Sequence, residues 1–162
     1  MRRGGKAIIA IAVAGGLAGA VVPTAAADDT SLRAAGQSRD GQFADLSERT
    51  TGAFRGWSDA GFSAAGRNRI VRLHRQTRRE LRIVSTNIRS EQPSSENGAD
   101  YKRLLLRSLR YFDAALQSEV VAVRARTAGR ARRARSAFDR AGARFTRSVR
   151  NERAAIRAIE RG

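Results

Sequence analysis

Residues 130–159 read RARRARSAFDRAGARFTRSVRNERAAIRAI, and this stretch has the clearest periodicity in the chain. Its large apolar residues recur at helical spacing and fall within about 40° of one another at 100° per residue. They are Phe138, Phe145, Val149 and Ile156. The opposite half of the same helix carries Arg140, Arg144, Arg147, Arg150, Arg153, Arg157 and Arg161. The stretch therefore predicts an amphipathic helix with one apolar side and one strongly basic side.

Three further helices are predicted upstream, over about 42–57, 62–88 and 100–123. Their apolar stripes run from Phe43 to Trp57, from Phe62 to Ile88 and from Tyr101 to Val123. Residues 91–99, EQPSSENGA, have the composition of a loop, and Asp100 is the expected N-cap of the helix that follows. Because no segment alternates with a period of two, the sequence predicts an all-α protein.

The connection between the last two helices decides the architecture. Gly129 is the only helix breaker between them, and one Gly costs only about 1 kcal/mol relative to Ala. A turn near 127–129 predicts a four-helix bundle. An uninterrupted helix, roughly 90 Å long at 1.5 Å per residue, predicts a long helical hairpin instead. In either case we expect a single helical domain over 41–161, preceded by a flexible segment over 28–40.

The N-terminus has the three parts of a secretory signal peptide. Arg2, Arg3 and Lys6 precede an apolar run over 7–22, and Ala25 and Ala27 form an A-x-A cleavage site. We therefore expect residues 1–27 to be removed and the protein to be secreted or associated with the cell envelope. The alternative is an uncleaved anchor, although the run is shorter than the roughly 20 residues that span a bilayer. The chain has no Cys, which excludes a lipoprotein anchor and a disulfide framework.

The basic charge is concentrated in the second half of the chain. The whole sequence has a net charge of +17. Residues 28–100 hold 12 basic and 10 acidic residues, whereas residues 101–162 hold 17 basic and 5 acidic residues. Such an excess indicates an anionic partner, here wall polymers, anionic lipid headgroups or extracellular nucleic acid. The sequence contains no recognised nucleic-acid-binding motif. The alternative to a binding role is that the arginines form the ordinary solvent-facing side of bundle helices.

The arginines expected to bind a polyanion lie on two of the predicted helices. We expect them to act through the guanidinium fork, which matches phosphate and carboxylate groups. They are Arg75, Arg78, Arg79, Arg82, Arg130, Arg132, Arg133, Arg135, Arg140, Arg144, Arg147 and Arg150.

Enzymatic chemistry has little support in the sequence, and we expect neither activity nor a cofactor. His74 is the only histidine, expected as a boundary or core residue, and no nucleophile or zinc motif is present. Glu80, Glu119 and Glu152 project into or beside the apolar stripes, so a metal-binding or enzymatic bundle is an alternative. Their predicted levels differ by about 13 Å and 22 Å along the helices, too far to share an ion.

Cationic partners are the better explanation of the inward glutamates. Folding the helices back on one another places Glu80 near Arg107 and Arg110, and Glu152 near Lys102 and Arg103. The leading hypothesis is an exported, non-enzymatic helical protein that associates with polyanions by charge. The alternative is an envelope chaperone that cradles unfolded clients on its basic surface.

Overall fold

The computed structural model describes residues 29–161, so the predicted signal peptide at 1–27 lies outside the described part of the chain. The order of elements is α1 (Thr30–Gln37), α2 (Asp40–Asp59), α3 (Ala64–Ser90), α4 (Glu96–Thr127) and α5 (Ala131–Ile159). No strand occurs in this range. The protein is therefore all-α, as predicted.

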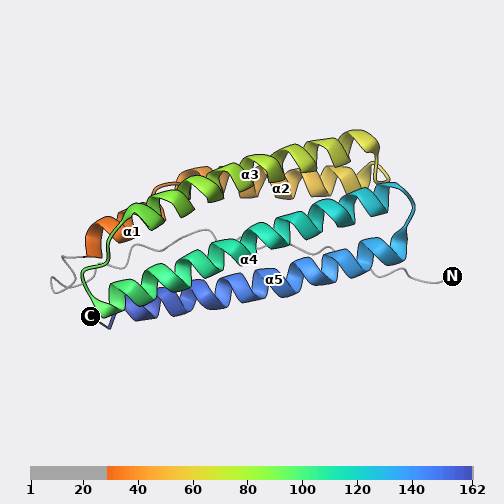
Figure 1. Cartoon of the computed structure of the whole chain (residues 1–162). Coiled ribbons are helices and arrows are strands. Elements are labelled where there is room, and N and C mark those ends of the chain that lie inside the picture. The colour runs from red at the N-terminus through yellow and green to blue at the C-terminus, as the bar shows by residue number, and fades with distance from the viewer. Residues whose placement is uncertain (1–28, 162) are drawn as a thin grey trace.

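The long helices lie side by side along one axis (Figure 1). α3 packs against α2 on one side and against α4 on the other, and α4 and α5 form the most extensive contact. The α2–α3 and α4–α5 turns lie at the same end of the molecule, and the α3–α4 loop lies at the other end. We call these the turn end and the loop end.

The turn between α4 and α5 excludes a single long helix over 100–161. α4 ends at Thr127, and Gly129 adopts a left-handed φ of 73° before α5 begins at Ala131. Only Gly adopts this conformation without steric cost. The predicted turn near 127–129 is thus confirmed.

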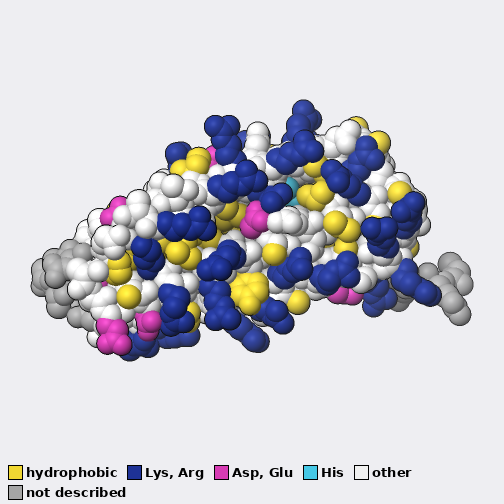
Figure 2. Space-filling model, viewed as in Figure 1, with side chains coloured by type: hydrophobic (Ala, Val, Ile, Leu, Met, Phe, Trp, Pro, Cys, Tyr) yellow, Lys and Arg dark blue, Asp and Glu magenta, His cyan; other side chains and the backbone are white. Residues whose placement is uncertain are grey.

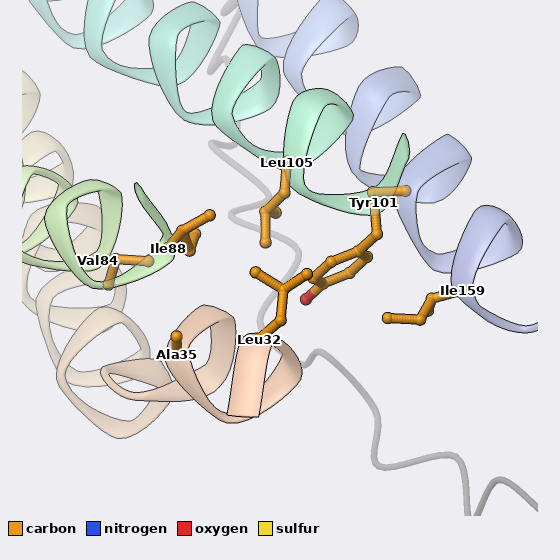
Figure 3. Packing of buried hydrophobic residues seen from close by; sticks show 8 residues of the cluster. Leu32, Ala35, Val84, Ile88, Tyr101, Leu105 and Ile159 are labelled. Atoms are coloured by element: carbon orange, nitrogen blue, oxygen red, sulfur yellow. The ribbon is translucent and has the colours of Figure 1, made fainter. Parts of the chain in front are cut away.

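Residues 30–37 correct the prediction of a flexible segment over 28–40. They form α1, whose Leu32 is fully buried among Val84, Ile88 and Leu105 (Figure 3). α1 is too short for its periodicity to stand out in the sequence. Burial of Leu32 against α3 and α4 stabilises a helix that would be marginal alone.

The start of α4 also differs from the prediction, because Ser95 rather than Asp100 caps the helix. The Ser95 hydroxyl accepts a hydrogen bond from the backbone N–H of Gly98 at 2.9 Å. Asn97 and Gly98, which were read as loop residues, are helical. A capped first turn tolerates their low helix propensity.

α4 and α5 bury a series of small residues in addition to the aromatic pair of Phe112 and Phe145. Fully buried alanines and serines recur along both helices, many at intervals of seven: Ser108, Ala115, Ala122, Ala134, Ala141, Ser148 and Ala155. Ser108 and Ser148 each donate to the other's backbone carbonyl, at 2.9 and 3.0 Å. Small side chains let the two backbones approach closely.

The large apolar residues on the predicted apolar side of α5 are only half-buried. Phe138 packs on Phe54 of α2, and Phe145 packs on Phe112 of α4, with ring centroids 6.4 and 5.3 Å apart. α2 and α5 thus meet through aromatic rings. The large residues fill space between helices, while the alanines set the helix spacing.

Candidate functional site

Most of the predicted polyanion-binding arginines lie on the surface. Arg75, Arg79, Arg82, Arg130, Arg132, Arg133, Arg135, Arg140, Arg147 and Arg150 are exposed. Within residues 29–161 none of these ten forms an ion pair. Figure 2 shows Lys and Arg side chains distributed over the α3, α4 and α5 faces of one side of the molecule. Their charges are available to a partner.

Two of the predicted arginines are instead used within the fold. Arg78 donates from Nε to Asp113 Oδ1 at 2.5 Å and joins α3 to α4. Arg144 donates to the backbone carbonyl of Ala114 at 2.9 Å and also to the Ser118 hydroxyl. Both arginines are half-buried, so we remove them from the candidate surface.

Phe62 and Tyr111 contact arginines at the surface. The guanidinium of Arg126 lies 4.2 Å from the centroid of the Phe62 ring, and that of Arg147 lies 5.9 Å from Tyr111. A cation over a ring face gains about 0.5–1 kcal/mol at an exposed site. The Arg126 contact ties the α2–α3 turn to the end of α4.

His74 is the centre of the most polar part of the core. It is 0% exposed, and its Nε2 lies 2.8 Å from Oε2 of Glu119, which is 2% exposed. Neither ring nitrogen of His74, nor Oε2 of Glu119, forms a well-aligned hydrogen bond among the described residues. The prediction of a boundary or core histidine is confirmed, because His74 lies in the core. Its contact with Glu119 was not predicted from the sequence.

A small cavity adjoins this pair between α2, α3 and α4. Its volume is about 20 Å³, and Ser47, Thr50 and Thr77 line it together with His74 and Glu119. A cavity of this size accommodates one water molecule. Four apolar side chains, Phe43, Leu46, Phe112 and Leu116, complete the lining, and the cavity is too small for an organic substrate.

The cationic partners predicted for the inward glutamates are wrong. Glu80 pairs with Arg39, at 3.6 Å, rather than with Arg107 or Arg110. Lys102 donates to the backbone carbonyls of Arg89 and Glu91, and Arg103 pairs with Asp100. Neither binds Glu152. The register between α3 and α4 is close to the predicted one, since Arg78 pairs with Asp113. Glu80 instead faces Arg39 at the start of α2, a helix that the prediction did not consider as a source of partners.

Glu152 lies instead near Asp40 and Tyr101. Burial raises the pKa of Glu152, the charge of Asp40 raises it further, and Arg153 acts in the opposite direction. Burial likewise raises the pKa of Asp40. The pKa of Tyr101 is raised to about 12 by burial; Arg33 opposes this shift, whereas Asp40 and Glu152 add to it. The carboxylates of Asp40 and Glu152 are therefore poorly stabilised in their ionised form.

A third carboxylate, that of Asp29, shows the opposite shift of its pKa. Asp29 is 5% exposed and accepts hydrogen bonds from the Ser94 backbone N–H at 3.0 Å and from the Ser94 and Ser95 hydroxyls. Burial, the largest single effect, raises the pKa of Asp29, but the Ser95 and Ser94 hydrogen bonds and the Arg33 charge together lower it. Asp29 therefore ties the start of the described chain to the α3–α4 loop.

No group of three or more His, Asp or Glu side chains within 29–161 lies close enough to hold one metal ion. None of the helices in that range combines the length and the apolar character that crossing a membrane requires.

Comparison of the chain with protein-family models, curated proteins and solved structures finds no match. The candidate surface therefore has to be interpreted from its own chemistry.

Proposed function

We propose that this chain is an exported, non-enzymatic helical protein, an up-and-down bundle of four long helices, that associates with anionic polymers by charge. The observation that supports this proposal most is the set of ten exposed arginines without an ion-pair partner in the described range. Residues 29–161 contain 29 basic and 14 acidic residues. A partner that neutralises this excess gains electrostatic energy and releases its own counterions.

Guanidinium groups suit this role better than ammonium groups would. Each presents several N–H donors in a rigid fork that pairs with two oxygens of a phosphate or carboxylate. Along the α3 axis, Arg75 and Arg79 lie about 6 Å apart and Arg79 and Arg82 about 4.5 Å apart, at 1.5 Å per residue. An extended polyanion that follows the helix can therefore contact several of them at once.

The small extent of exposed apolar surface favours an anionic polymer as the partner over a lipid membrane or an unfolded client protein. Val121, 40% exposed, is the one large apolar side chain of the described residues that is classed as exposed. Insertion into a lipid interface and capture of unfolded clients both use broad apolar surfaces. Charge pairing alone is the mechanism that this surface supports.

The direct test uses the chain from residue 28 onward on immobilised heparin and on immobilised DNA. We expect retention at low salt and elution by a salt gradient, because the contacts are ionic. Passage of the protein through both columns at low salt would contradict the proposal. Sequencing of the N-terminus of protein recovered from the culture medium and from the cell envelope tests export and cleavage after Ala27 separately.

A matched pair of variants distinguishes surface arginines from structural ones. Arg75→Gln/Arg79→Gln/Arg82→Gln should elute at markedly lower salt with an unchanged unfolding midpoint. Arg78→Gln should elute at a salt concentration lowered only as much as the loss of one charge explains. It should unfold at a lower urea concentration than the unmodified chain, because it breaks the pair with Asp113. If both variants lost the same retention on the columns per arginine replaced, the exposure of an arginine side chain would not determine its contribution to binding.

A further inference from the structure

The fold distributes charge unequally between the two ends of the molecule. Near the turn end, residues 55–72 and 119–140 contain eleven arginines against Asp59, Glu119 and Asp139, a net charge of +8. Near the loop end, residues 29–45, 85–105 and 150–161 contain nine basic and eight acidic residues, a net charge of +1. In Figure 2, most acidic side chains of the visible face lie towards the loop end.

Two separate parts of the sequence build the positive end. The α2–α3 turn brings Arg67 and Arg69 to the same end as the α4–α5 turn (Figure 1). The contact of Arg126 with Phe62 and that of Phe54 with Phe138 hold these parts together. We define the turn-end patch by its exposed arginines: Arg69, Arg124, Arg130, Arg132, Arg133 and Arg135.

The arginines of the turn-end patch point in several directions. Arg132, Arg133 and Arg135 of α5 spread over an arc of about 160°, taking 100° per residue. Arg130, Arg132 and Arg133 also line an open concavity together with Ser136. The patch is therefore a convex surface that surrounds the start of α5 and includes one shallow depression.

We infer that the turn-end patch is the primary docking site for a flexible, linear phosphodiester polymer. This inference rests on the proposed function and locates it on the molecule. A flat membrane can meet only the arginines that face one plane, whereas a flexible strand can wrap around the end and reach arginines across the arc. A phosphodiester strand carries one charged phosphate per repeat and can bend between repeats, so successive phosphates can each pair with a guanidinium group that points in a different direction.

The experiment compares two triple variants of α5 that lose the same charge at opposite ends. Arg132→Gln/Arg133→Gln/Arg135→Gln changes the turn-end patch. Arg153→Gln/Arg157→Gln/Arg161→Gln changes exposed arginines at the loop end. The probe is a fluorescent oligothymidylate, titrated at several salt concentrations. Circular dichroism and urea unfolding establish that each variant is folded.

We expect the turn-end variant to lose affinity by at least about tenfold near physiological salt. Its slope of log affinity against log salt should become less steep by about 2, since single strands contribute about 0.7 per phosphate contact. The loop-end variant should change that slope by less than about half as much. Arg132→Lys/Arg133→Lys/Arg135→Lys keeps the charge but loses the guanidinium fork, so its affinity should lie between those of the glutamine variant and the unmodified chain.

The outcomes separate this inference from the proposed function. If the unmodified chain does not bind the oligonucleotide, heparin or DNA, the proposed function fails. If it binds but both triple variants lose affinity equally, only the turn-end docking site is wrong. Tighter binding to vesicles of phosphatidylglycerol and phosphatidylcholine, or to polyglutamate, than to oligothymidylate would overturn the assignment of a phosphodiester strand.

Discussion

His74 and Glu119 show how one buried pair shapes the core at the scale of residues. Nε2 of His74 and Oε2 of Glu119 lie 2.8 Å apart, and no other charged side chain lines the adjoining cavity. Breaking a buried pair leaves an uncompensated polar or charged group, whereas replacing both members by apolar residues is often neutral or stabilising. The pair therefore contributes more to the register between α3 and α4 than to net stability.

Substitution of His74 and Glu119 tests this interpretation. His74→Leu should cost about 3–5 kcal/mol in the free energy of unfolding, because it strands the Glu119 carboxylate. His74→Leu/Glu119→Leu should recover most of that loss. Urea unfolding at neutral pH measures both values. A double variant that is as unstable as the single variant would show that the pair is needed for stability itself.

Asp29 predicts a pH dependence with a definite sign. Because its folded pKa is lowered, the ionised carboxylate stabilises the protein above the unfolded pKa, and this contribution disappears as pH falls through the folded pKa. Asp29→Asn should cost about 1–2 kcal/mol near neutral pH, the range for hydrogen bonds to a charged group. The difference from the unmodified chain should shrink as pH falls below about 4. A pH-independent difference in urea unfolding would contradict this account.

At the scale of elements, the α4–α5 pair explains why the helix spacing was not evident from the sequence. Hydrophobic periodicity predicted that Phe138 and Phe145 lie on the apolar side of α5. Both are only half-buried, whereas the buried residues of α5 are mostly alanines, together with Ser148 and Ile159. Close packing is stabilised both by small residues, which let two backbones approach, and by large apolar residues, which bury surface area. Hydrophobic periodicity detects mainly the large apolar residues.

Two glycines near and within α5 should respond to substitution in opposite ways. Gly129 has a φ of 73°, so Gly129→Ala should destabilise the protein by about 1–2 kcal/mol. Gly142 lies inside the helix with open space around an added Cβ, so Gly142→Ala should stabilise it by up to about 1 kcal/mol. Thermal unfolding measures both, and the same sign of effect in both variants would contradict the assigned turn.

At the scale of the whole molecule, surplus positive charge acts on stability as well as on binding. Like charges repel in the folded state, and salt screens this repulsion over a Debye length that falls from about 30 Å at 0.01 M to about 8 Å at 0.15 M. We therefore expect the urea midpoint to rise between these salt concentrations. The rise should be smaller for Arg132→Gln/Arg133→Gln/Arg135→Gln, which relieves repulsion at the turn end. A midpoint that falls with salt would mean that attractive pairs dominate.

Local chemistry in the sequence determined the helical class, the approximate limits of the four long helices and the turn at Gly129. Periodicity, capping residues and Gly are properties of neighbouring residues, so they can be read without knowing the tertiary contacts. Only the tertiary structure decided that α1 is a helix, that Glu119 meets His74, and that arginines from α3, α4 and α5 gather at the turn end. These features depend on loop length, helix register and how closely two backbones approach, which are set by contacts between residues far apart in the chain.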